Sequence, residues 1–551
     1  MTLPPALLHG LGQAARARHA LAFAHAADAP ERAQWDRLRT ILRANTDTEY
    51  GRRYGFASID SPSSYAARVP LVTPAEVAPW VDRMMAGERG VLTAEHPVYY
   101  CRTTGSTGRP KHVPITAAYR AEFQKTVHVA LWHLYARFPA AFFGRALYFV
   151  GTRREAVAVD GCDIGTMSGF NFNALPPLLR AVYAWPYELF EVEDLPTRSY
   201  LALALACVSN VSLIAGIFPA PIVYLLRDLE SRCELLADFL ARGALPQDLR
   251  LTPVQRAFFS ARLPANLAVA RRLRAAARGP RGALVTTAWP GLRLVYCWTT
   301  ATAGLFIPEL KERLGPQVAV RDAIFSACEG WCTIPMGDEE SGGPLAVNVH
   351  HFEFIPEAEY LAGRRDTLPV SALRDGERYF LVVTQSGGLY RYDLGDLLEV
   401  CGFWRNTPRL RFVRKAGAFS NLVGEKLDEG HVNAALASLC LNPTWFALVP
   451  CPGERPGYAL HLELPAGMGS PDDAALAAAL EGALARECHD FGRYRESGAL
   501  AVTRIRRLPA GTYDEYRQRR VAAGAAEAQL KTAHLVSDRA ELPPELQADG
   551  A

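Results

Sequence analysis

A run of nine residues, most of them small, hydroxyl-bearing or basic, stands out just after the first hundred residues. In order it contains Thr103, Thr104, Gly105, Ser106, Thr107, Gly108, Arg109, Pro110 and Lys111. Glycines let the backbone approach a ligand closely, while hydroxyl and N–H groups can donate hydrogen bonds to phosphate oxygens. Lys111 adds a point charge. The run lacks the Gly-Lys-Ser/Thr ending of a P-loop, so it predicts a polyphosphate-binding loop of another kind, between a strand and a helix.

Two carboxylates farther along the chain are candidate ligands. Glu329 ends the segment Phe325–Glu329, and Asp396 ends the segment Tyr390–Asp396 directly after Gly395. A glutamate oxygen is a hard ligand of the kind that Mg²⁺ prefers. An aspartate after a glycine can accept hydrogen bonds from a vicinal diol, although it can also form an Asx turn. A surface-loop glutamate is the alternative interpretation of Glu329.

Other reactive side chains carry weaker signals. Cys328 places a soft thiol beside Glu329, but no paired base that could activate it is visible in the sequence. His350 and His351 are consecutive in a predicted strand, so at most one of them faces a pocket, and simple strand packing is favoured. Taken by itself, Lys531 in the C-terminal tail is an ordinary solvated lysine.

The elements that must position these residues belong to a chain of 551 residues, which should form two or more domains. Its apolar content of 49% and charged content of 21% are typical of a soluble globular protein. The net charge of +3 and the absence of basic blocks argue against a nucleic-acid partner. The eleven scattered cysteines, without a C-x-x-C pair, indicate reduced thiols and a cytoplasmic location. Zinc binding by Cys328 and Cys332 is disfavoured for want of a second pair.

The fold class predicted is α/β, with a large N-terminal domain of several subdomains and a smaller α+β C-terminal domain. Residues 1–414 form the first and residues 415–551 the second, which is expected to be mobile. We expect helices within 12–44, from Thr116 past His133, and over 253–278 and 307–314, and strands near 146–151, 292–298, 346–351 and 379–384. The uncharged stretch 201–226 is long enough to span a bilayer. Its polar residues and prolines favour a buried helix-turn-helix, so no membrane contact is predicted.

The motifs together resemble the acyl-adenylate-forming superfamily, which includes acyl-CoA synthetases and luciferases. In that comparison the loop 103–111 resembles the phosphate-binding signature, so Thr103, Thr104, Gly105, Ser106, Thr107, Gly108 and Lys111 are implied to bind ATP. Glu329 resembles the glutamate that holds Mg²⁺, with Cys328 beside the nucleotide where serine or threonine is usual. Asp396 and Arg414 take the positions that contact the ribose. Residues 298–304 correspond to a segment bordering the adenine and acyl pockets.

Within the superfamily, the chain resembles the auxin-responsive Gretchen Hagen family of acyl amido synthetases. The phrases that carry this likeness are Phe352–Pro356, Gly388–Tyr392, Val400–Phe403 and Gln529–Thr532. The resemblance implies that Lys531 lies on the small domain and swings toward the ATP phosphates, with rotation near Arg414. Lys111, Glu329 and Lys531 are then the catalytic residues. Alanine enrichment indicates a GC-rich genome, and we expect a bacterial member.

The resemblance implies a two-step ligase that uses ATP and Mg²⁺. A small-molecule carboxylic acid first becomes an acyl-AMP with release of pyrophosphate. An amine, expected to be that of an amino acid, then displaces AMP to form an amide. Coenzyme A, a carrier-protein thiol or another nitrogen nucleophile are alternative acceptors. A different interpretation of the whole chain is a non-catalytic relative that binds a nucleotide. Aromatic residues within 145–225 are candidates for an apolar acyl pocket, although most of them are expected in the core. The sequence leaves the oligomeric state open.

Overall fold

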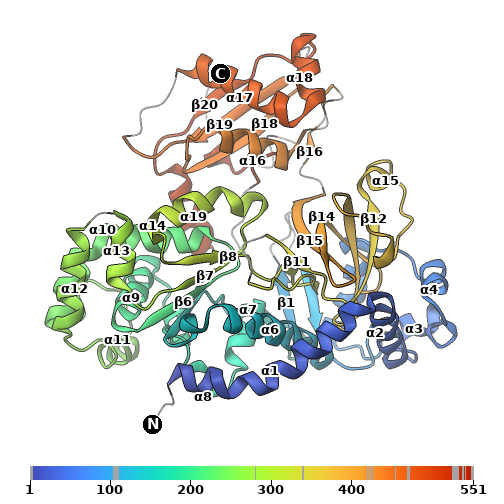
Figure 1. Ribbon diagram of the computed structural model, residues 1–551, viewed down its shortest axis with the longest axis horizontal. Helices are drawn as coiled ribbons and strands as arrows, with labels where there is room; N and C mark the ends of the chain where they lie inside the picture. The colour runs from blue at the N-terminus through green and yellow to red at the C-terminus, as the bar shows by residue number, and fades with distance from the viewer. Residues whose placement is uncertain are drawn as a thin grey trace. The chain divides into compact units, whose positions relative to one another are not determined.

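The computed structural model describes residues 4–103, 111–279, 281–337, 341–416, 419–420, 422–423, 425, 427–452, 455–467, 472–523, 533–536, 539 and 542–547. The chain forms two compact units (Figure 1). Unit 1 contains residues 1–394 and 398–412, and unit 2 contains residues 395–397 and 413–551.

Unit 1 begins with helices α1 (Pro5–Asp28) and α2 (Pro30–Ala44). The helices expected within 12–44 are α1 and α2. They are separated at Ala29 because Pro30 lacks an N–H and disfavours helical geometry in the residue before it. The short helices α3, α4 and α5 follow at Glu49–Arg53, Pro62–Arg68 and Pro74–Met85. The last two have capping boxes at Ser61 and Thr73.

The first sheet has the strand order β2-β1-β5-β4. Its strands are β1 (Tyr99–Thr103), β2 (Lys111–Ile115), β4 (Ala156–Val157) and β5 (Asp163–Gly165). β1 is central, pairing antiparallel with β2 and parallel with β5. Helix α6 (Ala117–Arg137) follows β2 with Thr116 as its N-cap, and α7 (Met167–Asn173) follows β5. The prediction of a helix from Thr116 past His133 is confirmed.

A four-stranded parallel sheet of order β3-β6-β7-β8 forms the second part of unit 1. Its strands are β3 (Arg145–Tyr148), β6 (Val211–Ala215), β7 (Leu294–Tyr296) and β8 (Ala319–Arg321). Helices α8 to α14 lie between β3 and β8 in the sequence (Figure 1). Their bounds are Pro177–Arg180, Leu195–Val208, Ala220–Arg242, Pro253–Ser260, Leu267–Ala277, Arg281–Ala288 and Ile307–Leu314. Buried leucines, valines and alanines of α9, α10, α12 and α13 pack in one core with this sheet.

Two predictions in this part are wrong in detail. The segment 201–226 is a helix, the buried strand β6 and the start of α10, not a helix-turn-helix. The apolar run of Val211–Ala215 is rich in β-branched residues, which favours a strand in a buried parallel sheet. The helix expected over 253–278 is interrupted between Ser260 and Leu267, where Pro264 lies. Among the described residues, no helix is both long and apolar enough to cross a bilayer.

A five-stranded sheet has the order β11-β15-β14-β13-β12. Its strands are β11 (Gly343–Pro344), β12 (His351–Pro356), β13 (Arg378–Thr384), β14 (Tyr392–Trp404) and β15 (Thr407–Lys415), with helix α15 (Glu357–Leu361) after β12. The strand predicted at 346–351 begins only at His351. Leu345, Ala346, Val347 and Val349 are nonetheless buried, so apolar composition alone misplaced this strand.

Unit 2 is an α+β arrangement around the sheet β18-β19-β20. These strands are Trp445–Cys451, Gly457–Glu463 and Arg504–Arg507, and a small β16–β17 pair lies at Phe419–Ser420 and Leu427–Asp428. The helices are α16 (Glu429–Ser438), α17 (Asp473–Glu487), α18 (His489–Glu496) and α19 (Thr512–Ala522). The mixed α/β class with a smaller α+β C-terminal part is confirmed.

Candidate functional site

Two of the predicted phosphate-binding residues, Thr103 and Lys111, lie at the facing ends of strands β1 and β2. Thr103 ends β1 and Lys111 begins β2, and the two residues pair directly across the ladder. Thr104, Gly105, Ser106, Thr107 and Gly108 lie outside the described residues. The helix expected after the loop is α6, and strand β2 lies between the loop and this helix. Thr103 and Lys111 are therefore placed by a sheet that is hydrogen-bonded on both sides of β1.

Glu329 lies in the turn of a second, smaller hairpin. β9 (Ser326–Ala327) pairs with β10 (Gly330–Trp331), which leaves Cys328 and Glu329 as the two connecting residues. Glu329 is 9% exposed, and the hydroxyl of Tyr392 on β14 lies 3.4 Å from its Oε1 atom. Within the described part of the chain, Glu329 forms no ion pair. A largely buried carboxylate without a cationic partner fits the binding of a divalent cation, since burial of an uncompensated charge is unfavourable.

The backbone of this turn is fixed by Tyr119 on α6. The Tyr119 hydroxyl donates a hydrogen bond to the carbonyl oxygen of Cys328 at 2.7 Å. The Tyr119 ring is fully buried and stacks on the ring of His350, with centroids 5.6 Å apart. One tyrosine thus joins the helix that follows β2 to the turn that carries Glu329.

Behind Tyr119 lies a buried polar cluster. Nδ1 of His350 is 3.1 Å from Oε2 of Glu122, and Arg37 and Ser386 also bond to Glu122. Burial lowers the pKa of His350, and although burial opposes ionisation of Glu122, His350 and Arg37 hold its pKa below the ordinary value. Both shifts favour a neutral imidazole beside a carboxylate neutralised by Arg37. His350 is fully buried, so it packs in the core as expected and does not face a pocket.

His351 is also buried and packs edge-on against Tyr65, with ring centroids 5.9 Å apart. Burial lowers its pKa below the ordinary value. His351 therefore has a packing role, like His350.

The segment Tyr390–Asp396 contains one residue with unusual backbone geometry. Arg391 has φ +46°, and its guanidinium bonds to Glu353 at 3.0 Å and to the carbonyl oxygens of Ala66 and Val69. Left-handed backbone is unfavourable for a residue with a side chain. The buried bonds of Arg391 hold the chain in this conformation directly before Tyr392, so Arg391 places the tyrosine that contacts Glu329.

The predicted ribose-contacting residues lie in unit 2. Asp396 is 2% exposed, and one of its carboxylate oxygens accepts a hydrogen bond from Nζ of Lys415 at 2.5 Å. Nε of Arg414 is 3.1 Å from Oδ2 of Asp428, which caps the N-terminus of α16. Asp396 and Arg414 are thus both held in ion pairs with neighbours on unit 2. Lys531 lies outside the described residues.

The loop predicted to border the nucleotide is held by Asp322, which the sequence analysis did not single out. Oδ1 of Asp322 accepts the N–H of Thr299 at 3.0 Å, and Oδ2 accepts the N–H of Gly342 at 2.7 Å. Burial raises the pKa of Asp322. The Trp298 indole donates to the carbonyl of Ile324, next to Phe325, which stacks on Phe412 at 5.0 Å.

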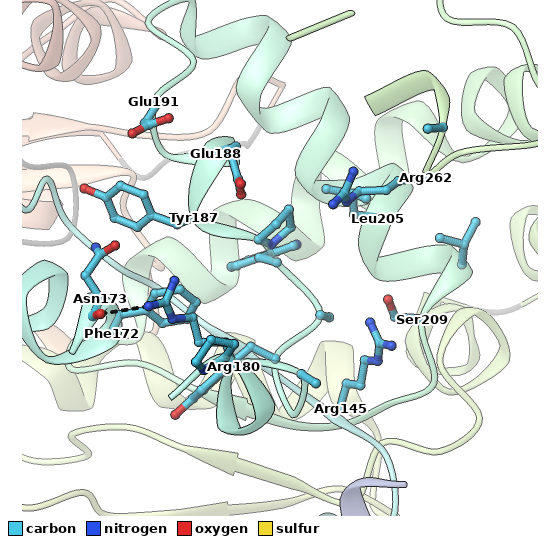
Figure 2. Close-up of a pocket in the computed structure, with 18 of the residues that line it drawn as sticks. Arg145, Phe172, Asn173, Arg180, Tyr187, Glu188, Glu191, Leu205, Ser209 and Arg262 are labelled. Atoms are coloured by element: carbon cyan, nitrogen blue, oxygen red, sulfur yellow. Dashed lines mark hydrogen bonds between the residues drawn. The ribbon is translucent and has the colours of Figure 1, made fainter. Parts of the chain in front are cut away.

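A hollow of about 1040 Å³ opens elsewhere on unit 1 (Figure 2). Arg145, Arg180 and Arg262 lie around it together with Glu188 and Glu191. The aromatic candidates Phe172, Tyr183 and Trp185 also line it, whereas none of the predicted nucleotide residues that the structure describes does so. Several of the aromatic candidates pack on one another, as Phe149 does on Trp185 at 5.0 Å. The charged side chains around the hollow do not suit an apolar acyl group. Of the aromatic candidates, Phe172 and Trp185 are buried in the core.

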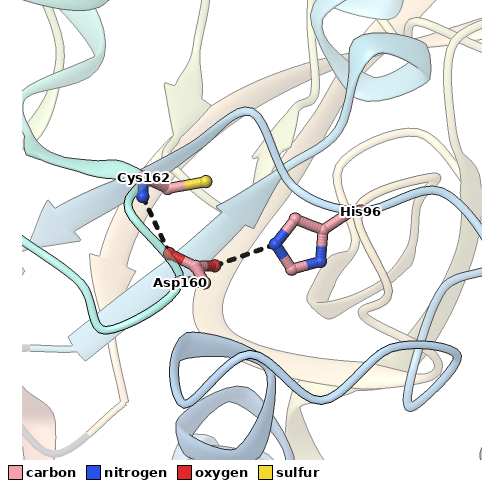
Figure 3. Close-up of side chains that lie close together, drawn as sticks. All are labelled: His96, Asp160 and Cys162. Atoms are coloured by element: carbon pink, nitrogen blue, oxygen red, sulfur yellow. Dashed lines mark hydrogen bonds and ion pairs between the residues drawn. The ribbon is translucent and has the colours of Figure 1, made fainter.

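A compact cluster of His96, Asp160 and Cys162 lies beside β1 (Figure 3). Asp160 Oδ2 is 3.0 Å from Nε2 of His96 and accepts the Tyr100 hydroxyl at 2.9 Å, while Oδ1 accepts the N–H of Cys162. Both carboxylate oxygens are therefore satisfied. Because Tyr100 belongs to β1, the cluster anchors the strand that leads to Thr103.

Models of the GH3 family match most of the chain. The N-terminal domain model covers residues 21–319, the central domain model covers 343–415, and the C-terminal domain model covers 430–540. Thr103 and Lys111 lie within the first model, and Asp396 and Arg414 lie within the second. The Cys328–Glu329 turn lies between these two models.

Named relatives and solved structures agree with the family. An indole-3-acetic acid-amido synthetase of Oryza sativa subsp. indica is 25% identical over 547 residues, covering 91% of this chain and 87% of the relative. A jasmonoyl–L-amino acid synthetase of Nicotiana attenuata is 24% identical, covering 73% and 72%. The fold matches a GH3.15 acyl acid amido synthetase with TM-score 0.84 and 19% identity, over 97% of this chain and 96% of the other.

A more distant fold match is a 2-hydroxyisobutyryl-CoA ligase in complex with its acyl-AMP, with TM-score 0.55 and 15% identity, over 93% of this chain and 90% of the other. These relatives include plant enzymes, and the expected bacterial origin is not supported by them. With the family models covering well over half of the sequence, the chain belongs to the GH3 family.

Proposed function

We propose that the protein is an ATP-dependent ligase that activates a small-molecule carboxylic acid as an acyl-AMP and transfers the acyl group to the amine of an amino acid. The match to amido synthetases over most of both chains supports this reaction. The observation that carries it in the structure is the buried Glu329 turn, fixed by Tyr119 from the helix that follows the β1–β2 connection. ATP serves as substrate, and Mg²⁺ is the proposed cofactor.

Each residue has a role that follows from the charge formed in the reaction. Attack of a carboxylate on the α-phosphate builds negative charge while pyrophosphate leaves, so catalysis consists of positioning and charge stabilisation. Lys111 supplies a positive charge at one end of the phosphate loop. Glu329 would hold Mg²⁺, which neutralises phosphate charge when bound. Tyr392 orients the Glu329 carboxylate, and Asp396 and Arg414 are proposed to contact the ribose.

The second step requires the amine to reach the acyl-AMP. We propose that residues 415–551 act as a mobile domain, that Lys531 approaches the phosphates for the first step, and that rotation near Arg414 then admits the amine. AMP is a good leaving group, so the amine nitrogen attacks the activated carbonyl carbon and the C–O bond to AMP breaks. A cytoplasmic location is part of the proposal.

The test is carboxylate-dependent release of pyrophosphate from Mg·ATP over a panel of aryl and alkyl acids, followed by mass analysis of products with amino acids or coenzyme A. Lys111→Ala and Glu329→Gln should each reduce the release at least tenfold. Lys311→Ala and Glu312→Gln, on the exposed face of α14, are matched controls that should retain it. Amide formation with an amino acid supports the proposal, whereas a thioester as the only product would reassign the acceptor. Absence of release with every acid, despite measured ATP binding, would refute catalysis.

A further inference from the structure

Two cysteine sulfur atoms lie within 2.9 Å of each other at the candidate site. They are Sγ of Cys101 in β1 and Sγ of Cys328 in the turn that carries Glu329. Both residues are free cysteines in this structure. A disulfide bond is about 2.05 Å long, so the two sulfurs need to approach by only about 0.9 Å to form one.

The backbones on both sides of this sulfur pair are fixed. Cys101 pairs with Val113 in β2 and with Gly165 in β5, and the carbonyl oxygen of Cys328 accepts the hydrogen bond of Tyr119. The two side chains therefore face each other across a packed region. Because β1 is paired on both sides, closing the remaining distance draws the Cys328 turn toward β1. Cys332 is close in sequence, but its thiol is directed to the carbonyl of Gly330.

The two thiols differ in access to solvent. Cys101 is fully buried, whereas Cys328 is partly exposed. The hydrogen bond with Cys328, together with burial, raises the pKa of the Cys101 thiol well above its ordinary value. Cys328 is thus the thiol that a dissolved reagent meets first, and Cys101 is the one that can resolve an adduct on it.

We propose that Cys101 and Cys328 form a reversible disulfide by exchange with a low-molecular-weight disulfide such as oxidised glutathione, and that this bond switches off adenylation. Cys328 gives up its proton and attacks one reagent sulfur, which breaks the reagent S–S bond and releases one thiol. Cys101 then loses its proton and attacks the Cys328 sulfur, releasing the second thiol. Two protein thiols are oxidised to one disulfide, the reagent is reduced to two thiols, and the two protons end on these thiols.

Loss of activity follows from the position of the bond. The inhibitory part of the inference rests on the proposed ligase function. Cys101 lies two residues before Thr103, and Cys328 directly precedes Glu329. Drawing the Cys328 turn toward β1 displaces Glu329 relative to Tyr392, and a displacement of about 1 Å at a reacting centre can reduce the rate by roughly a hundredfold.

The experiment treats the full-length protein with oxidised glutathione and maps peptides without reduction. A peptide that joins residues 101 and 328 is expected, with pyrophosphate release at least tenfold lower and restored by dithiothreitol. Cys101→Ala should instead accumulate a glutathione adduct on Cys328, because the resolving thiol is missing. Cys440→Ser removes an exposed thiol and should respond like the unaltered protein.

Each contrary outcome is decisive. Absence of the 101–328 peptide under conditions that place glutathione on Cys440 would refute the disulfide. Formation of the peptide with unchanged pyrophosphate release would refute the switch. A reduced protein without any release would contradict the ligase function, while peptide mapping, which needs no activity, would still decide whether the disulfide forms.

Discussion

The hydroxyl of Tyr119 and the carbonyl oxygen of Cys328, 209 residues apart in the sequence, are joined by a hydrogen bond of 2.7 Å. This bond links α6 to the β9–β10 turn. Because α6 begins two residues after β2 ends, the bond sets Glu329 relative to Lys111 through fixed secondary structure. The site is thus positioned by its backbone as well as by its charged side chains.

Tyr119→Phe tests that link. The ring and its stacking on His350 are retained, so stability should fall by only about 1 kcal/mol. The turn loses its donor, and we expect kcat/KM for Mg·ATP to fall about tenfold and the Mg²⁺ concentration for half-maximal rate to rise. Tyr99→Phe is the matched control, since the Tyr99 hydroxyl also donates to a backbone carbonyl at 2.7 Å, that of Arg153. An equal change in Mg²⁺ dependence in both variants would show that the effect is only structural.

Asp396→Asn tests the proposed ribose contact. A contact made equally in the ground state and transition state affects binding alone. We therefore expect KM for ATP to rise about tenfold or more while kcat changes less. Asp393→Asn is the control from the same strand, because Asp393 accepts the hydroxyl of Tyr360 at 2.8 Å. Steady-state pyrophosphate release measures both constants, and a fall in kcat without a rise in KM would contradict the assignment.

Arg391 and Arg405 form a natural comparison of buried and exposed ion pairs. Both have positive φ, +46° and +54°, and each bonds to a carboxylate, that of Glu353 or Asp28. Arg391→Ala leaves Glu353 buried without its partner and should lower the free energy of unfolding by about 3–5 kcal/mol. Arg405→Ala, at an exposed pair, should cost about 1 kcal/mol or less. Urea unfolding compares the two, and similar losses would contradict this account.

His534 should make unit 2 sensitive to acid. Its ring is buried against Phe446, and burial lowers its pKa to about 4. A histidine with a depressed pKa contributes its full stabilisation above its unfolded pKa of about 6.5, and the contribution declines as the pH falls toward 4. Between pH 7 and pH 5 the loss should be about 2 kcal/mol. His534→Gln should reduce this loss in urea unfolding, whereas His489→Gln, at an exposed position, should not.

Local sequence patterns predicted helices and strands well where the pattern was typical of only one of the two. The helix expected at 307–314 has those bounds, and the strand expected at 379–384 differs by one residue. The pattern failed at 201–226, where the uninterrupted apolar run did not distinguish a buried strand from a helix. It also failed near Pro264, where a helical composition extended across the break between α11 and α12.

Motifs in the sequence suggest residues for the site but not the contacts that position them. Motif likeness singled out Lys111, Glu329 and Asp396, and the placement of Glu329 in a buried turn agrees with its proposed role. The sequence could not indicate Tyr119, Asp322 or the sulfur pair, because their partners come from distant segments. Cys101 and Cys328, for example, are 227 residues apart. Such contacts depend on the tertiary fold, which local periodicity does not encode.

Gln34 has a consequence for the order in which the protein can be built. Its side-chain amide donates to the carbonyl oxygens of Val347 and His350 and accepts the N–H of Phe352, at 2.7, 2.7 and 2.6 Å. During synthesis, the Gln34 amide on α2 can therefore form these hydrogen bonds only after more than 300 further residues have been made. A fragment that ends at residue 319, where the N-terminal family model ends, would expose this amide and the apolar face around it. The N-terminal segment therefore depends on the central segment to satisfy this buried amide, although separate family models cover the two segments.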